Sequence, residues 1–283
     1  MKKFLLITFI ILLSIFGILL YSRYVATSGL ITKEYVINDN IASNYDGLKI
    51  VHFSDLHYGR LISNDQLKRI SDEINLINPD IVVFTGDLID KDIDIDKFSD
   101  KELISFLSSI NTKYGKYAIR GNHDYLVYAD KIASLFTDTG FIYLENSYDI
   151  LYNESNDKIF IGGLDTSFYD KEDLDKTLSY QDNSISYKIV LTHEPDISDE
   201  IVNKDNTINL ILAGHSHNGQ VRLPFIGALS TPDKAKKYYD NYYKINNTNL
   251  YISSGIGVST YDFRLFNRPS INFYRINKIN TQN

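Results

Sequence analysis

The sequence predicts an α/β protein with packed sheets, preceded by a membrane-spanning segment. Three observations carry this prediction: an uncharged apolar run near the N-terminus, strands that alternate with helices after it, and a strand-rich second half. Alternation of strands and helices is typical of α/β architecture. The composition, with 43% hydrophobic and 23% charged residues, is that of an ordinary globular protein and excludes a disordered or fibrous chain.

The apolar run at 4–21 is long enough to cross a bilayer. As a helix its 18 residues reach about 27 Å, close to the ~30 Å hydrocarbon core. A cleaved signal peptide is the alternative, but its apolar region normally spans only about 7–15 residues. Two lysines precede the run, so the positive-inside rule favours a single-pass protein of the cell membrane with its body outside the cytoplasm. We therefore expect residues 1–29 to form an anchor and residues 30–283 one domain.

The first half of the body alternates strands with helices. Residues 48–53 form the short, branched, apolar run of a buried parallel strand, and Ser63 is a typical helix cap. In chain order the predicted elements are a strand at 48–53, a helix from Ser63 to about Asn78, a strand at 81–85, a helix from Ser99 or Asp100 that carries Leu103 to Ile110, a strand at 117–120 and a helix near 127–137.

The second half is rich in strands. The strand candidates lie at 141–145, 148–152, 158–162, 187–192, 208–213, 219–223, 249–253 and 271–276. We find no internal repeat and no linker that would divide the body, so the sheets are expected to pack within one domain.

Two segments have more than one interpretation. Residues 87–100 carry six aspartates, but they lack the turn glycine and terminal glutamate of a calcium loop, so we expect a solvated loop. Residues 233–244 mix lysines with four tyrosines. A half-buried hairpin is expected there, and a loop that touches membrane headgroups is the alternative.

Charge and cysteine content exclude several functions. The chain has no cysteine, which rules out disulfides, thiolate metal ligands and a cysteine nucleophile. Its net charge of −7 is a poor match for a nucleic-acid backbone, so no nucleic-acid partner is expected. No obligate protein partner is expected either.

Five short polar blocks follow predicted strands directly. The blocks are Ser54-Asp55-Leu56-His57, Thr85-Gly86-Asp87, Gly121-Asn122-His123-Asp124, Thr192-His193-Glu194 and Gly214-His215-Ser216-His217. In an open α/β sheet, ligand-binding groups collect where the carboxyl ends of strands meet loops. The five blocks can therefore converge on one crevice.

The residue types in these blocks indicate a metal site. Imidazole, carboxylate and amide oxygen without sulfur suit manganese, iron or zinc. Seven such ligands are too many for one ion and suit two ions about 3.5–4 Å apart that share a carboxylate. The Asp-x-His and His-x-His pairs can each present both ligands to one side only if their backbone is extended.

These motifs resemble the metallophosphoesterase (calcineurin-like phosphoesterase) superfamily, and in particular its membrane-anchored bacterial phosphodiesterase branch. The resemblance rests on Gly47–Val51, Ser54–His57 and Gly214–Gln220, and it extends from about Lys49 to Gln220. It implies a β-sandwich of two mixed sheets flanked by helices. By position, one metal ion would take Asp55, His57 and His217, the other Asn122, His193 and His215, and Asp87 would bridge them.

The resemblance also implies roles for residues around the metals. His123 would protonate the leaving oxygen and Asp124 would orient it. Arg264 and Arg268 match an arginine-bearing tail segment of the branch and would hold a phosphate oxygen, although a surface salt bridge is an equal alternative. Glu194 and Asn218 depart from the branch, which often has asparagine and glycine there. Asparagine tolerates positive φ, so the second departure is mild.

The expected activity is metal-dependent hydrolysis of a phosphoester by a metal-bridging hydroxide, with His123 as general acid. Two divalent cations, two carboxylates and a hydroxide leave a charge of about +1, which leans toward a phosphodiester. Relatives in the branch imply a phosphodiester or pyrophosphate of a lipid headgroup. The alternatives are a phosphomonoesterase acting on nucleotides or proteins and, from another class, a non-catalytic metal-binding scaffold.

Overall fold

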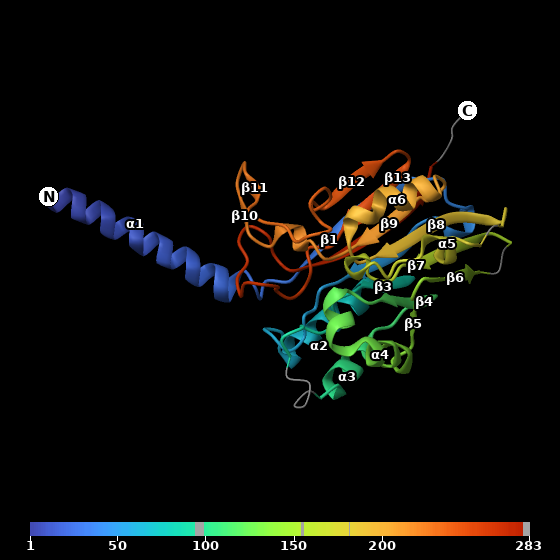
Figure 1. Cartoon of the computed structure of the whole chain (residues 1–283), viewed down its shortest axis with the longest axis horizontal. Helices are drawn as coiled ribbons and strands as arrows, with labels where there is room; N and C mark the ends of the chain where they lie inside the picture. The colour runs from blue at the N-terminus through green and yellow to red at the C-terminus, as the bar shows by residue number, and fades with distance from the viewer. Residues whose placement is uncertain (94–98, 154–155, 181, 280–283) are drawn as a thin grey trace.

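The protein is a sandwich of two six-stranded mixed sheets with helices outside, and a long N-terminal helix projects from one end (Figure 1). The structure is a computed structural model that describes residues 1–93, 99–153, 156–180 and 182–279. The N-terminal helix α1 (Lys2–Leu20) continues through one π-helical turn, η1 (Tyr21–Val25), into the body. The α/β class and the two mixed sheets expected from the sequence are confirmed.

The first sheet has the order β1-β14-β2-β3-β4-β5, and β2 to β5 run parallel. Its strands are β1 (Ile31–Asp39), β14 (Ser270–Lys278), β2 (Leu48–Phe53), β3 (Ile81–Thr85), β4 (Gly115–Ile119) and β5 (Phe141–Tyr143). Its outer face is covered by α2 (Asn64–Ile77), α3 (Lys101–Ser109) and α4 (Asn122–Asp138).

The second sheet has the order β12-β13-β9-β8-β7-β6, with β13, β9, β8 and β7 parallel. Its strands are β6 (Ser147–Tyr152), β7 (Lys158–Gly163), β8 (Ile185–Thr192), β9 (Leu210–Ala213), β12 (Tyr242–Ile245) and β13 (Thr248–Ile252). Two short helices lie in the connections between its strands: α5 (Leu174–Thr177) between β7 and β8, and α6 (Ser198–Lys204) between β8 and β9. A separate hairpin is formed by β10 (Arg222–Leu223) and β11 (Gly227–Ala228).

Three apolar layers hold these elements together. One lies between the first sheet and α2 to α4, where Leu67 and Ile70 meet Phe84. The second lies between the two sheets, and the third packs Ile201 of α6 against the outer face of the second sheet. The core is therefore that of a helix–sheet–sheet–helix sandwich, and both sheets present the carboxyl ends of parallel strands to the site.

Several boundaries differ from the sequence-based expectations. The helix expected near 127–137 begins at Asn122, because its first turn holds site residues whose polarity masks the helical pattern. Of the strand expected at 219–223, only Arg222–Leu223 is extended, since a 3-10 turn occupies His217–Gly219. β1 had no counterpart among the strand candidates. It is mostly half-exposed at the sheet edge and therefore lacks the apolar run of a buried strand.

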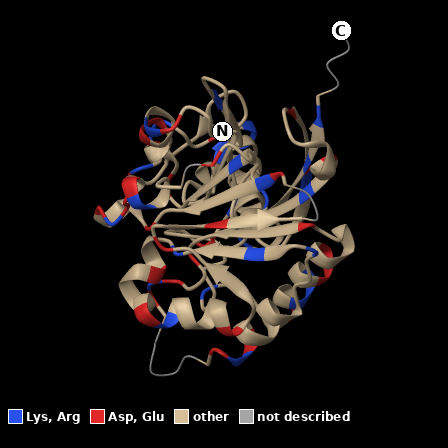
Figure 2. Ribbon diagram, turned by 90° about the vertical axis from the view of Figure 1, so that its right-hand side faces the viewer, with Lys and Arg blue, Asp and Glu red and all other residues tan. Residues whose placement is uncertain are grey.

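The two ambiguous segments are partly folded into the body. Between residues 87 and 100, Asp92 is exposed as expected but Asp90 is buried, and Asp94 and Asp96 lie outside the described residues. In the segment 233–244, only Tyr242 and the residues after it join a hairpin, which β12 forms with β13. Lysine, arginine and acidic residues are interspersed over the ribbon (Figure 2).

The N-terminal helix is apolar and leaves the body without packing on it. Lys2–Val25 is long and apolar enough to cross a membrane, and none of the residues of α1 is buried. Below α1 the chain contacts the body: Ser22 and Ala26 are buried, and the Ser22 carbonyl accepts a hydrogen bond from Arg264 N at 3.0 Å. The segment expected as an anchor, residues 1–29, therefore includes a last part that belongs to the packed body.

Candidate metal centre

The polar blocks converge where the two sheets meet. β2, β3 and β4 of the first sheet end just before Asp55, Asp87 and Asn122, and β8 and β9 of the second end just before His193 and His215. All five strands present their carboxyl ends to the same crevice, as the sequence predicts for parallel strands. Residues far apart in the chain thus come within a few ångströms of each other.

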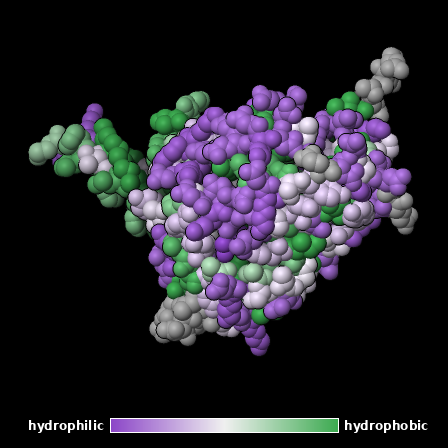
Figure 3. Space-filling model, turned by 45° about the vertical axis from the view of Figure 1, so that its right-hand side comes forward, coloured by the Kyte–Doolittle hydropathy of each residue, from purple (hydrophilic) through white to green (hydrophobic). Residues whose placement is uncertain are grey.

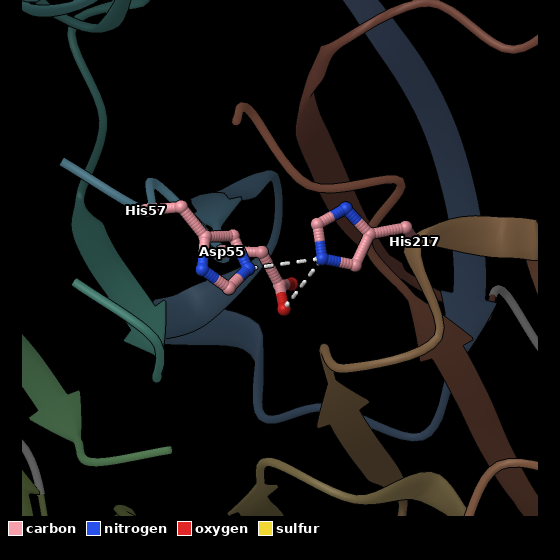
Figure 4. A group of neighbouring side chains, drawn as sticks. All are labelled: Asp55, His57 and His217. Carbon is pink, nitrogen blue, oxygen red and sulfur yellow. Dashed lines mark hydrogen bonds and ion pairs between the residues drawn. The ribbon is translucent and has the colours of Figure 1, made fainter. Parts of the chain in front are cut away.

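The first group of side chains is Asp55, His57 and His217, whose ligand atoms lie within 4.8 Å of one another (Figure 4). The Nε2 atoms of His57 and His217 are 3.1 Å apart, and His217 Nε2 is 3.4 Å from Asp55 Oδ1. These three residues are the set expected for one metal ion. Each is almost completely buried, so their donors face one another and not bulk water.

The second group is Asp87, His193 and His215. His193 Nε2 lies 3.2 Å from Asp87 Oδ2 and 3.2 Å from Asn122 Oδ1. The Asp87 Oδ2 atom is also 3.7 Å from His57 Nε2, which belongs to the first group. Asp87 therefore lies between the two groups, at the place expected of a bridging carboxylate.

The tautomers of two histidines fit metal binding. His193 Nδ1 donates to the Thr85 carbonyl at 2.6 Å, and His215 Nε2 donates to the Asp233 carbonyl at 2.8 Å. Since a carbonyl only accepts, the other nitrogen of each ring carries a lone pair when the ring is neutral, as it is when it binds a metal ion. Together with the carboxylates and the Asn122 amide, this donor set suits divalent manganese, iron or zinc.

The backbone at these residues adopts an unusual conformation. Asp55, His57, Asp87, His215 and His217 all have positive φ, between 45° and 63°. Positive φ is uncommon outside glycine, and residues held there cluster at functional sites. The expectation of an extended backbone for Asp-x-His and His-x-His is therefore wrong: both residues of each pair reach the site through left-handed turns.

Two glycines allow the loops of β3 and β4 to meet. Gly86 has a φ of 92°, and a Cβ at this position would lie 2.6 Å from Gly121 N. A Cβ at Gly121 would in turn overlap Asp87. A side chain at Gly86 would collide with the His193 ring and the Gly121 main chain, and one at Gly121 would collide with the Asp87 carboxylate.

Burial and charge shift the pKa values of the cluster. Burial raises the pKa of Asp55. It also disfavours charge on Asp87 and His193, but the attraction between these two outweighs it, holding the pKa of Asp87 well below and that of His193 well above its usual range. The carboxylates thus favour a positive charge between them, which is what a divalent cation supplies.

His123 lies at the pocket side of the cluster. Its Nδ1 accepts a hydrogen bond from Lys91 N at 3.3 Å, which leaves the ring proton on Nε2. Burial lowers the pKa of His123 to about 4, although the negative charge of Asp87 opposes this. The main-chain N–H of His123 donates to Asp87 Oδ1 at 2.9 Å, so the ring position depends on the bridging carboxylate.

Asp124 does not take the place expected for it. Its carboxylate accepts hydrogen bonds from Ile89 N and Gly121 N, both at 3.0 Å, so it orients two loops and not the His123 ring. The carboxylate near that ring is Asp90, 3.9 Å from His123 Nδ1 and 3.4 Å from His57 Nδ1. The sequence pattern does not single out Asp90, because this residue lies in the acid-rich segment; its position three residues after Asp87 is the one available signal.

The two tail arginines lie away from the pocket. Arg264 is fully buried and donates to the carbonyls of Ser254, Gly255 and Gly257, with NH2 3.2 Å from His217 Nδ1. It therefore supports the loop that carries His217. Arg268 is exposed, and its side chain lies against Gly29. Neither is among the described residues that line the pocket, so the expected phosphate contact has no support in their positions.

The two departures from the branch pattern leave the ligand set intact. Glu194 is buried and accepts hydrogen bonds from Thr166 Oγ1 at 2.5 Å and from Ser167 N at 2.8 Å. Asn218 has a φ of 48°, the left-handed conformation that asparagine tolerates. Both residues hold local structure beside the cluster.

A pocket of about 420 Å³ opens directly over the cluster. Asp87, Asn122, His123, His215 and His217 form its floor. Its walls carry apolar side chains, which are Phe168, Val221, Leu229, Pro232, Tyr261 and Phe263. The arrangement combines a polar floor of candidate metal ligands with walls that carry both apolar and polar side chains.

Comparison with known proteins points to one family. The profile described as calcineurin-like phosphoesterase matches residues 48–219. The uncharacterized metallophosphoesterase YkuE of Bacillus subtilis is 34% identical over 263 residues, which cover 92% of this chain and 90% of that protein. The UDP-2,3-diacylglucosamine pyrophosphatase LpxG of Chlamydia muridarum is 26% identical over 80% of this chain and 82% of that protein.

A solved structure has the same fold. The NAD nucleotidase NadN of Haemophilus influenzae superposes with a TM-score of 0.50 at 18% identity, over 74% of this chain. The chain spans 45% of the length of that nucleotidase, so the likeness is one of fold alone. From the family profile and the sequence relatives, the chain belongs to the calcineurin-like phosphoesterase family and is a metal-dependent phosphoester hydrolase.

Proposed function

We propose that the protein hydrolyses a phosphodiester or pyrophosphate in a lipid headgroup at the membrane surface, with its body outside the cytoplasm. The observation that carries this proposal is the pocket: its floor is the cluster of candidate metal ligands, and its walls carry apolar side chains beside polar ones. Such a pocket suits a substrate with a charged phosphoryl group and an apolar part. The 26% identical pyrophosphatase LpxG acts, by its name, on a diacylated sugar nucleotide, which supports the same substrate class.

The residues that would hold two divalent ions are those of the two groups. Asp55, His57 and His217 would bind one ion; Asn122, His193 and His215 would bind the other; and Asp87 would be shared. When bound, the ions supply Lewis-acid polarisation of the phosphoryl group and a water-derived nucleophile at neutral pH.

The other residues position and protonate the substrate. His123, on the pocket floor, would give a proton to the leaving oxygen. Asp90 and Asp87 lie near its ring and favour the imidazolium form, while burial opposes it. Lys91 lines the same pocket and can attract a phosphoryl oxygen.

Metal analysis joined to a substrate panel tests this proposal. The purified full-length protein is assayed on a soluble diester, a soluble monoester and a lipid pyrophosphate, and its bound metal is counted by mass spectrometry. We expect two divalent ions per chain and preference for the diester or pyrophosphate. A clear preference for monoesters would contradict the proposed substrate class. Metal binding without any hydrolysis would favour the alternative of a non-catalytic metal-binding scaffold.

Two variants separate metal binding from proton transfer. Asp87→Asn is expected to remove most activity and reduce bound metal toward one per chain, because a neutral amide bridges two cations poorly.

His123→Gln is expected to keep both metals but to slow substrates with poor leaving groups by roughly 10²–10⁴-fold more than nitrophenyl esters. Near-normal turnover with two metals in Asp87→Asn, or equal slowing of both kinds of ester in His123→Gln, would refute the corresponding role.

A further inference from the structure

The β10–β11 hairpin exposes large apolar side chains at its tip. Phe225 is fully exposed and Ile226 is 71% exposed, and Leu229 just after the hairpin is 56% exposed. Single exposed apolar residues are common on soluble proteins, but a contiguous group at the end of a projecting hairpin indicates a contact surface. The two strands pair only through Arg222 with Ala228 and Leu223 with Gly227, so the tip projects free of the sheets.

The hairpin is tied to the point where α1 leaves the body. Arg222 N donates to the Leu265 carbonyl at 2.9 Å, and Leu265 N donates back to the Gln220 carbonyl at 3.3 Å. The adjacent Arg264 N donates to the Ser22 carbonyl at 3.0 Å. One short segment, 264–265, thus fixes both the root of the hairpin and the end of the N-terminal helix.

The hairpin and α1 lie at the same end of the molecule (Figure 1). In the space-filling view, hydrophobic atoms cover the helix and also gather on the body beside it (Figure 3). The last turn of the helix carries Tyr24, 66% exposed, next to Arg23, a pairing of aromatic and basic residues that is typical of the membrane–water interface. With α1 in the hydrocarbon core, the turn at Tyr21–Val25 stands at the headgroups.

We propose that the tip of the β10–β11 hairpin, Phe225 and Ile226, inserts into the leaflet from which α1 emerges, as a second membrane contact. The partner is the lipid itself, because the tip lies at the end of the molecule from which α1 leaves, and its apolar side chains are exposed there. Insertion is limited to the interfacial layer. The main chain of so short a hairpin carries polar groups that could not be satisfied deeper in the hydrocarbon.

The second contact would also orient the metal pocket. Val221 and Leu229, which flank the hairpin, form part of the apolar wall of the pocket. A hairpin seated in the leaflet therefore places that wall at the lipid surface and turns the pocket mouth toward it. This consequence rests on the proposed lipid substrate, whereas the membrane contact itself does not.

The absence of tryptophan from the sequence makes a direct test possible. Phe225→Trp in the full-length chain introduces a single tryptophan at the tip. The protein is reconstituted into vesicles of phosphatidylethanolamine and phosphatidylglycerol, with or without phosphatidylcholine brominated near the top of its acyl chains. We expect blue-shifted emission that the brominated lipid quenches.

A matched control is Tyr152→Trp. Tyr152 is 61% exposed on β6, at the end of the molecule opposite α1 (Figure 1). Its emission should be that of indole in water and should not respond to brominated lipid. Ile226→Trp, at the neighbouring tip residue, repeats the measurement should Phe225→Trp disturb the fold.

The outcomes separate this proposal from its alternatives. Water-like emission at the tip, with no more quenching than the Tyr152→Trp control, would overturn it. The proposal would also be overturned if the emission is blue-shifted but is not quenched by brominated lipid, and if the shift disappears when the protein is diluted in the bilayer. The tip would then be covered by a second copy of the protein. Neither readout depends on hydrolysis, so failure of the proposed activity would leave the result intact.

Discussion

At the scale of single residues, the carboxylate of Asp90 lies between the proposed metal ligand His57 and the proposed proton donor His123. It lies 3.4 Å from Nδ1 of the first ring and 3.9 Å from Nδ1 of the second, and it is 1% exposed. A carboxylate behind a metal-binding imidazole fixes the ring and raises its basicity. We therefore expect Asp90 to position the His57 ring and to influence the nearby His123 ring.

Replacing this carboxylate by its amide tests the coupling. Asp90→Asn keeps the size of the side chain but removes its charge, and we expect a loss of about 10–100-fold in metal affinity or in turnover of a soluble diester. Metal titration and kcat measurement give both numbers. The exposed Asp92→Asn serves as the matched control and should change neither. An Asp90→Asn protein that is indistinguishable from this control would exclude a role in positioning.

The buried His52 makes stability depend on pH. Burial lowers the pKa of His52 to about 3, while an unfolded chain has a histidine pKa near 6.5. As the pH falls below about 6.5, the unfolded state therefore binds a proton that the folded state does not, and stability decreases. Between pH 7 and pH 5 this single group lowers the free energy of unfolding by about 2 kcal/mol.

The variant His52→Gln isolates this contribution. A glutamine amide can still reach Thr85 Oγ1 and Tyr274 Oη, the two hydroxyls that His52 contacts at 2.8 and 3.2 Å, but it does not titrate. Urea unfolding of both proteins at pH 7 and pH 5 should show that the variant loses less stability. If both proteins lose the same amount, His52 is not held neutral in the fold.

The residues of the site differ in how well the sequence predicts them. The convergence of the proposed ligands is predictable, because each follows a strand and belongs to a short motif of one chemical type. Asp90 and Asp124 are not, since which of two nearby carboxylates faces the His123 ring depends on the path of the loop after Asp87. The tail arginines show the same limit: the sequence cannot tell whether a guanidinium faces the pocket or the main chain beneath it.

At the scale of elements, α2 shows how local sequence fixes a helix. Ser63 Oγ accepts from Gln66 N at 3.3 Å, and Gln66 Oε1 accepts from Ser63 N at 2.9 Å, which completes a capping box. The apolar residues Leu67, Ile70 and Ile74 then face the first sheet. Both features are visible in the sequence, and this helix was predicted close to its observed bounds.

Removing the cap should weaken the fold by a known amount. Ser63→Ala loses the side-chain acceptor for Gln66 N and is expected to lower the free energy of unfolding by about 1 kcal/mol. Ser63→Asp, which can cap in the same way, should stay close to the parent protein. Both values come from denaturant unfolding at one pH. Equal stabilities for the alanine and aspartate variants would mean that α2 is held by its packing alone.

Elements that depend on distant partners are harder to predict. β1 pairs in parallel with β14, so that Ile31 lies beside Ser270. The sequence pattern of neither strand indicates that they pair. The first turn of α4 lies outside the helix predicted near 127–137, because Asn122, His123 and Asp124 are polar and interrupt the apolar periodicity. Local propensity thus predicts the regular elements, whereas function and long-range pairing decide the rest.

At the scale of the whole molecule, the junction of anchor and body is the decisive feature. The Ser22 carbonyl accepts from Arg264 N, and the Arg264 side chain lies 3.2 Å from His217 Nδ1. The chain just after the candidate membrane helix therefore contacts the segment that supports His217, a proposed metal ligand. A cut through residues 1–29 is not equivalent to a cut that removes α1 alone.

Two deletions distinguish tethering from support of the site. Removing residues 2–20 takes away α1 but keeps Ser22, so turnover of a soluble diester should remain close to that of the full chain. Hydrolysis of a substrate embedded in vesicles should fall, because the tether no longer supplies a high local concentration. Removing residues 1–29 also deletes the contact with Arg264 and should lower turnover of the soluble diester as well. If the two deletions give the same turnover of the soluble diester, the residues after α1 act only as a linker. If the shorter deletion already lowers this turnover, α1 contributes to folding and not only to membrane attachment.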